Sequence, residues 1–373
     1  DTCRRQRQMC IRDRYTADTT EGRHLVANPY FHQVDPTGQQ LPYISEQDEV
    51  YKNDNEVRLL SIVNGDVDYK AQSLQLASAP ALLDGQAQGN YTVDLRPEIT
   101  LGVFSFNVTH EDEAKRNVFG DVRFREAMSI AINRAELNDV GFFGEGTPQQ
   151  YIGFSPKPAF VSDKWMSHAT EFDAARANSL LDEIGMKDTD GDGFRELPNG
   201  DKLVLNMSFA TQGIAGQTVE LVGQYWADVG VQSVVKEVTP DEFRSAQSAN
   251  KLDVMMWRKS QPLAILLGNN ELWVPPFENY FGVRTGMLWA EWVDSNGANG
   301  VEPPAYVKEL ISDINAFQSA DQSSDEFKVL GERMVKNMVE NLLFIGTVNA
   351  PAPMIHHNNL KNFTSFKTHS YEY

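Results

Sequence analysis

Residues 203–238 read LVLNMSFATQGIAGQTVELVGQYWADVGVQSVVKEV, and the alternation within this stretch indicates the fold class. Its two ends, residues 203–209 and 231–238, are rich in Val, Leu and Phe, as β-strands are. Between them, residues 217–228 carry apolar side chains at helical spacing: Val219, Val222, Tyr225 and Trp226. A strand, a helix and a strand in this order predict an α/β arrangement.

The same alternation continues on both sides of this stretch. A strand is predicted at residues 254–257, and helices at 173–184, 304–316 and 325–340. Toward the N-terminus, strands are expected within residues 24–50, a helix at 55–64, a short strand at 67–69, a helix at 73–83 and two strands within 91–108. Residues 342–348 predict a last strand, followed by a proline-containing segment and a short polar tail.

A continuous helix is predicted to begin at Asp121 and to run to residue 137. Its apolar stripe consists of Phe124, Ala127, Met128, Ala131 and Leu137. The charged side chains of this helix are expected to face outward: Arg123, Arg125, Glu126 and Arg134.

Length and charge exclude several classes of function. The 373 residues, 41% of them hydrophobic, suffice for more than one packed core, so two lobes are expected. The formal net charge of -19 would repel a phosphate backbone and an anionic lipid surface. No apolar run approaches the length of about 20 residues that spans a bilayer, and the N-terminus has no apolar segment typical of a secretion signal.

The first fourteen residues, DTCRRQRQMCIRDR, differ in character from the rest of the chain. They contain both cysteines of the chain, Cys3 and Cys10, and resemble translated adapter sequence, so we expect residues 1–14 to be non-native. The remaining 359 residues contain no cysteine, which excludes thiolate metal sites and cysteine nucleophiles there. Motifs such as HExxH, GxSxG and GxxxxGK[ST] do not occur.

Seven phrases follow one another in the order found in one protein family. Residues 119–149, FGDVRFREAMSIAINRAELNDVGFFGEGTPQ, resemble a segment of ABC-transporter solute-binding proteins of the oligopeptide and dipeptide class, called family 5. The other similar phrases are NPYF with LPYI at 28–44, NGDVD at 64–68, DTDGDGFRE at 188–196, YWADVGV at 225–231, MLWAEW at 287–292 and LFIGTV at 343–348.

This resemblance implies a periplasmic-binding-protein-like α/β fold of type II, with two lobes joined by two crossing strands at 104–108 and 344–348. Residues 15–107 would form a partial lobe I, residues 108–343 lobe III, and residues 344–373 would return to lobe I. Family members are longer, so the N-terminal part of lobe I is expected to be missing. The resemblance also implies a monomer, placed in the periplasm or anchored outside the cell, that delivers a peptide or an oligosaccharide to a membrane permease.

The residues expected to contact the ligand follow the strand at 254–257. Trp257 ends that strand, where α/β sheets place ligand crevices. In similar peptide receptors an Asp just after this strand pairs with the ligand's α-amino group, whereas here Arg258, Lys259 and Ser260 follow. Arg258 or Lys259 pairs with a ligand carboxylate or is simply solvated. Further candidates are Asn107, Trp273 and Trp289, although for each tryptophan core packing is the alternative interpretation.

Asp188, Asp190 and Asp192 have the spacing of a calcium loop, which the carbonyl of Phe194 would complete after Gly193. The twelfth position is Asn199 instead of Glu, so a solvated turn is favoured over a weak structural calcium site. No cofactor is otherwise expected.

The leading hypothesis is a receptor that binds a solute in a cleft between two lobes and is not an enzyme. The alternatives are a carbohydrate-active enzyme that uses two carboxylates and the tryptophans, and a sensor of the same fold without transport. Turnover of a glycoside would favour the enzyme.

Overall fold

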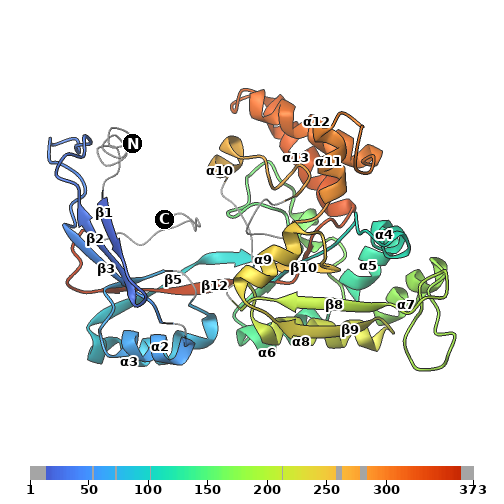
Figure 1. The fold of residues 1–373 in the computed structure, drawn as a ribbon, viewed down its shortest axis with the longest axis horizontal. Coiled ribbons are helices and arrows are strands. Elements are labelled where there is room, and N and C mark those ends of the chain that lie inside the picture. Colours follow the sequence, from blue (N-terminus) through green and yellow to red (C-terminus); the bar gives the residue numbers. More distant parts are fainter. Residues whose placement is uncertain are drawn as a thin grey trace. The chain divides into compact units, whose positions relative to one another are not determined.

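The computed structural model describes residues 14–52, 54–71, 74–100, 102–211, 213–257, 263–277 and 284–362. By internal contacts the chain divides into two compact units, one formed by Asp1–Val67 and Asp84–Asn90 and the other by Asp68–Leu83 and Tyr91–Tyr373. The elements are drawn in chain order in Figure 1. This division does not test the predicted lobe boundaries after residues 107 and 343, which stay a prediction.

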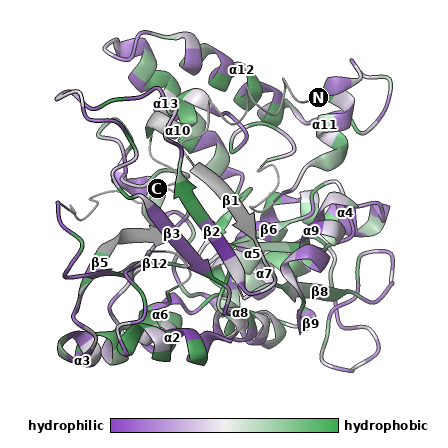
Figure 2. Ribbon diagram, turned by 60° about the vertical axis from the view of Figure 1, so that its left-hand side comes forward, coloured by the Kyte–Doolittle hydropathy of each residue, from purple (hydrophilic) through white to green (hydrophobic). Residues whose placement is uncertain are grey.

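The first unit contains a three-stranded antiparallel sheet with the strand order β1-β2-β3, where the strands are β1 (Arg14–Asp18), β2 (Gly22–Ala27) and β3 (Glu46–Val50). Helix α2 (Asn55–Val63) begins where predicted, because the carboxylate of Asp54 accepts hydrogen bonds from the amides of Glu56 and Val57. Strand β3 has the sequence EQDEV and is mostly exposed, and Figure 2 colours it hydrophilic. This sheet therefore turns an acidic edge strand to solvent.

One sheet of the second unit is centred on β12 (Val348–His357). Its antiparallel partners are β4 (Tyr69–Lys70), β5 (Tyr91–Thr100) and β7 (Thr147–Pro148). The register with β5 shifts between Ala350 and Ala352, so Pro351, which has no amide hydrogen, lies at a bulge. The prediction of a polar tail directly after the prolines was therefore wrong, because the strand continues to His357.

The predicted strand, helix and strand at residues 203–238 are confirmed as β8 (Val204–Phe209), α8 (Gly216–Asp228) and β9 (Gln232–Glu237), and β8 pairs parallel with β9. The neighbouring strand β6 (Val103–Phe106) pairs antiparallel with β10 (Val254–Trp257) and with β11 (Ile345–Gly346). Trp226 of α8 is fully buried against Phe104 and Phe106, with ring centroids 5.5 and 5.3 Å away. Helix α8 thus packs against both the β8-β9 sheet and the β10-β6-β11 sheet in one core.

The helix predicted at residues 121–137 is two helices, α5 (Val122–Ile130) and α6 (Arg134–Phe142). The side chain of Asn133 accepts a hydrogen bond from the amide of Glu136 and so begins the second helix. The predicted apolar stripe is buried, but Arg125 and Arg134 are buried as well, with 1% and 2% of their surface exposed. The prediction that both arginines face outward was wrong, because their guanidinium groups bind backbone carbonyls inside the core.

A second core cluster forms around α12 (Ala305–Ser319) and α13 (Asp325–Glu340), which were predicted and lie against each other. It includes Trp165, Trp257, Trp273 and Trp289. Trp289 lies on α11 (Met287–Asp294). The remaining elements are η1 (Leu76–Ser78), α3 (Ala79–Gly89), α4 (Glu113–Gly120), η2 (Asp163–Ser167), α7 (Ala174–Glu183), α9 (Pro240–Ser248) and α10 (Leu263–Gly268).

Candidate functional site

Strands β8 and β10 run in the same direction, so their carboxyl ends lie at one edge. Asp253, just before β10, accepts a 2.8 Å hydrogen bond from the amide of Asn206 near the start of β8. At the other end, Gly213 in the turn after β8 packs against the ring of Trp257, the last residue of β10. In open α/β sheets ligands bind outside the carboxyl ends of the strands, so this edge is the candidate binding edge.

Trp257 lies at this edge, but it is only 6% exposed. The ring of Phe243 from α9 stacks on the indole, with centroids 5.6 Å apart and planes 24° from parallel. The backbone of Gly213 packs against the six-membered ring of the indole. Trp257 is therefore packed among protein groups at the edge where a ligand is expected.

Asn107, another predicted ligand residue, is fully buried just after β6. Its side-chain amide donates a 2.8 Å hydrogen bond to the side chain of Asn250 and a 3.1 Å bond to the carbonyl of Leu252. Its side-chain oxygen accepts from the amide of Thr109. These bonds join β6 to the start of β10.

The other predicted ligand residues are not brought together at one surface. Trp273 is fully buried against Gly153 and Phe154, and Trp289 is 5% exposed beside Phe277. Arg258, Lys259 and Ser260 lie outside the described residues, so the predictions for them stay predictions.

The predicted calcium loop brings its acidic side chains close together. Oxygens of Asp188, Asp190, Asp192 and Glu196 lie within 4.8 Å of one another. Glu196, at the ninth position of the loop, was missed by the sequence analysis, although a calcium loop uses that position and the motif is followed by this acid. Phe194, whose carbonyl oxygen was predicted as a calcium ligand, donates a hydrogen bond from its amide to Asp192.

A lysine lies against this acidic loop. Lys202 donates hydrogen bonds of 2.7 Å to both Asp190 and Asp192. These bonds raise the pKa of Lys202 and lower the pKa of Asp192. Two of the four carboxylates thus share the single positive charge of Lys202. Whether calcium binds stays a prediction.

Replacing Lys202 by methionine is expected to lower the melting temperature in EDTA, because the carboxylates then repel one another without a counter-charge. Adding about 5 mM calcium is expected to restore the melting temperature of this variant, since weak oxygen sites bind in this range. Differential scanning fluorimetry checks both effects, with Lys236→Met, which removes a lysine paired only at 3.4 Å with Glu242, as the matched control. Equal melting of Lys202→Met and wild type in EDTA would contradict the expected role.

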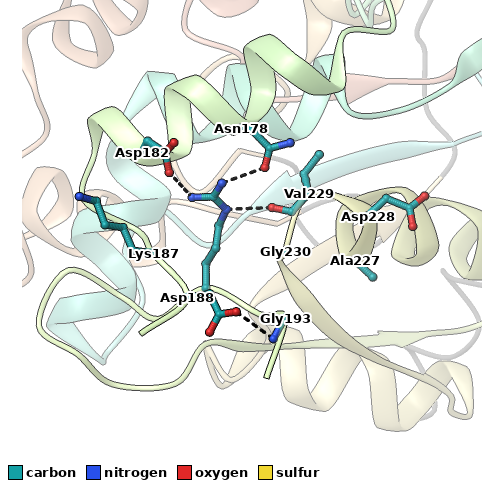
Figure 3. Close-up of a pocket in the computed structure, with 10 residues that line it drawn as sticks. Asn178, Asp182, Lys187, Asp188, Gly193, Ala227, Asp228, Val229 and Gly230 are labelled. Carbon is teal, nitrogen blue, oxygen red and sulfur yellow. Dashed lines mark hydrogen bonds and ion pairs between the residues drawn. The ribbon is translucent and has the colours of Figure 1, made fainter. Parts of the chain in front are cut away.

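A pocket of about 410 Å³ lies beside this loop, between α7 and the end of α8. The guanidinium of Arg195 donates there to Asp182, to Asn178 and to the carbonyl of Val229, at 2.6, 2.8 and 3.0 Å. Figure 3 shows these three acceptors at the pocket. Because β9 begins just after Gly230 of this pocket, the pocket lies at the amino ends of the strands. The polar groups of this surface depression therefore bind one another, and the depression lies at the edge opposite Trp257.

A buried charge cluster surrounds Asp253, whose side chain is 5% exposed. Its carboxylate accepts from Lys115 at 2.8 Å and from the amide of Asn206 at 2.8 Å, and lies 3.2 Å from the ring of His110. Burial by itself raises the pKa of Asp253, but the hydrogen bonds from His110, Lys115 and Asn206 outweigh it, so the pKa lies below its ordinary value. This cluster ties α4 to β8 and β10.

Comparisons with known proteins agree with this architecture. The periplasmic alpha-galactoside-binding protein of Rhizobium meliloti (strain 1021) is 26% identical over 363 residues, which cover 91% of this chain and 49% of that protein. This chain therefore spans about half the length of that curated relative. In the described part of the chain, no helix has both the length and the apolar character that crossing a bilayer requires.

Among solved structures, the oligopeptide-binding protein OppA is 29% identical, with a TM-score of 0.64 over 94% of this chain and 58% of its own. The periplasmic binding protein MelB of Agrobacterium fabrum C58, in complex with stachyose, is 21% identical, with a TM-score of 0.75 over 92% of this chain and 52% of its own. The predicted α/β fold of the type II periplasmic binding proteins is thereby confirmed.

The family match spans more than half of the chain. The family described as "Bacterial extracellular solute-binding proteins, family 5 Middle" matches residues 15–263, which include β8, α8, β9 and β10. The resemblance that the sequence phrases predicted is thereby confirmed: this chain belongs to family 5 of the bacterial extracellular solute-binding proteins.

Proposed function

We propose that the complete protein is the extracytoplasmic receptor of an ABC importer, which binds an oligosaccharide or an oligopeptide reversibly and presents it to a membrane permease. The family match over residues 15–263 carries this proposal, because the family consists of solute-binding proteins. The shared edge of β8 and β10 supports it, since it offers the place where α/β folds of this kind hold ligands. The protein would act as a monomer in the periplasm or on the outer face of the membrane, and not as an enzyme.

Within this proposal, an oligosaccharide is the favoured ligand. The relative from Rhizobium meliloti is named for binding alpha-galactosides, and MelB holds stachyose. The sequence after Trp257 continues with Arg258 and Lys259, and two cations would repel the ammonium group of a peptide. A neutral sugar carries no such group.

The experiment is isothermal titration calorimetry of the full-length protein with raffinose, stachyose and a mannose oligomer, against tri- and pentapeptides of the same concentration. We expect an α-galactoside to bind with a dissociation constant of about 1 μM, equivalent to about -8 kcal/mol, and the peptides to bind at least about tenfold more weakly. Preference for peptides would overturn the proposal that the ligand is an oligosaccharide. Absence of all binding would overturn the proposal that the protein is a solute receptor.

The same samples separate the receptor from the alternative enzyme. After incubation of the protein with stachyose, anion-exchange chromatography of the sugar measures whether a glycosidic bond is cleaved. A receptor leaves the sugar intact at stoichiometric binding, whereas released monosaccharide would establish a carbohydrate-active enzyme.

A further inference from the structure

We infer that Gly213 is a positioning residue, which lets the turn after β8 lie on the indole of Trp257 and so joins the ligand-binding edge to the strands β6 and β11. This inference rests on the proposed function for the location of the ligand. It assigns Trp257 the role of supporting the turn, in place of an exposed platform for the ligand.

Gly213 is required by a close approach and not by its backbone conformation. Its φ is not positive, so other residues can adopt the same backbone. A Cβ at this position, however, would lie 2.0 Å from Cε3 of Trp257 and 2.3 Å from both Cδ2 and Cζ3. Backbone and ring are therefore in direct contact, and even one methyl group would force them apart.

The indole cannot easily move away from an added methyl group. Trp257 is only 6% exposed, and Phe243 stacks on it. Strand β10 is also held by its pairing with β6, in which Trp257 lies opposite Val103. The turn, which carries the exposed residue Thr211 at the binding edge, is the part that would yield.

Two side chains that follow Gly213 in the chain pack beside the start of strand β6. Ile214 and Thr218 follow Gly213 and are buried. A Cβ on Gly102, just before β6, would lie 3.2 Å from a methyl of Thr218 and 3.6 Å from one of Ile214, so both side chains pack on this glycine. The turn is thus wedged between Trp257 on one side and Gly102 on the other.

Gly102 is in turn bonded to the segment after β11. The hydroxyl and the amide of Thr347 both donate to the carbonyl of Gly102, at 2.8 and 3.1 Å. Thr347 lies between β11 and β12, so a displacement of the turn reaches β6, β11 and β12 through contacts of buried groups. A solute that presses on the turn would act on these strands by the same contacts.

The test compares Gly213→Ala with Gly120→Ala, a matched control at which a Cβ meets no atom within 4 Å and φ is not positive. Hydrogen-deuterium exchange of the ligand-free protein is the first readout. We expect Gly213→Ala to speed exchange of the amides in residues 102–106 and 345–350 by about tenfold, and Gly120→Ala to leave them unchanged. Unchanged exchange in both variants would overturn the coupling, whether or not any sugar binds.

The second readout is affinity for the sugar that the wild type binds best. Gly213→Ala is expected to weaken binding about tenfold, and Trp257→Leu, which removes the ring that the methyl group would enter, to weaken it less. The double variant should then bind no more weakly than Trp257→Leu alone, since the clash is gone. If the affinity losses of the two single variants multiplied in the double variant, the inference would be overturned. A wild type that binds no sugar or peptide would contradict only the proposed function.

Discussion

Replacing Arg134 by methionine is expected to lower the free energy of unfolding of the second unit by about 3 kcal/mol. Its guanidinium donates two hydrogen bonds, of 3.0 and 2.8 Å, to the carbonyl of Gly346 and one of 2.8 Å to the carbonyl of Ser129. Methionine fills part of the volume but donates nothing, so the buried carbonyl of Gly346 loses both of these donors. The carbonyl of Ser129 loses one donor and keeps the amide of Ile132. Each such loss costs about 1 to 3 kcal/mol.

The charge of Arg134 does not reverse this expectation. Burial lowers the pKa of Arg134 to about 9, and Glu171 acts in the opposite direction, so the guanidinium is still charged at neutral pH. The buried charge costs free energy by itself, but its two carbonyl partners belong to buried residues of α5 and β11 and cannot reach water when it is removed. The net effect of the substitution is therefore destabilising.

Urea denaturation followed by tryptophan fluorescence measures this effect, because all six tryptophans lie in the second unit. The matched control is Arg123→Met, which removes an arginine from the exposed face of α5, where it pairs with Asp121, and should change the midpoint little. The urea midpoint of Arg134→Lys is expected to lie between those of wild type and Arg134→Met, since the lysine ammonium can make some of the hydrogen bonds of the guanidinium. An unchanged midpoint for Arg134→Met would contradict the structural role.

The misplacement of Arg125 and Arg134 shows what an amphipathic pattern leaves out. The pattern placed the apolar stripe of α5 and α6 correctly, because spacing along one helix determines which side chains share a face. The arginines are buried by partners far along the chain: Arg125 donates to the carbonyl of Asn341, and Arg134 to that of Gly346. Contacts across more than 200 residues leave no trace in a local pattern.

The strands show the same division between local and distant causes. Strands β8, β9 and β10 were predicted from short apolar runs bounded by turns. Strand β12 was missed beyond residue 348 because Pro351 and Pro353 are typical of loops, and only the pairing with β5 reveals that Pro351 lies at a bulge.

At the candidate site, sequence reasoning found the edge but not its packing. The end of β10 was predicted correctly as the place of Trp257, because a buried strand carries its last side chain to the sheet edge. The contact with Gly213 was not predicted, since a glycine in a turn is ordinarily explained by backbone freedom. In the structure its φ is not positive, and its backbone contacts the indole of Trp257.

The second large effect is expected at Asp253, where substitution by asparagine should destabilise the protein by about 3 kcal/mol at pH 7. Asparagine keeps the shape and one acceptor for the amide of Asn206, but it removes the charge that balances the ammonium of Lys115. Lys115 is 21% exposed, so its ammonium would remain largely buried without a counter-ion. Breaking one partner of such a pair costs more than the pair contributes.

The pH dependence of this effect follows from the direction of the pKa shift. The pKa of Asp253 is lower in the folded protein than in the unfolded chain, where it is about 3.9. Its contribution is therefore fully present above about pH 4 and is lost as the pH falls through the folded-state pKa. The difference in unfolding free energy between wild type and Asp253→Asn should shrink as the solution becomes more acidic than about pH 4, as far as the protein stays folded there.

Urea midpoints at pH 7.5, 5.0 and 3.5 measure this difference, and the chain offers a matched control in Glu111→Gln. Glu111 pairs with Lys251 at 2.6 Å and joins the residues just before α4 to those just before β10, but both side chains are about 60% exposed. Water and salt screen that pair, so its loss should change the midpoint little at any of these pH values. If Glu111→Gln were as damaging as Asp253→Asn, burial would not be what makes the Asp253 cluster strong. If Asp253→Asn were harmless at pH 7.5, the ammonium of Lys115 would have to reach solvent without its partner, contrary to the buried arrangement that ties α4 to β8 and β10.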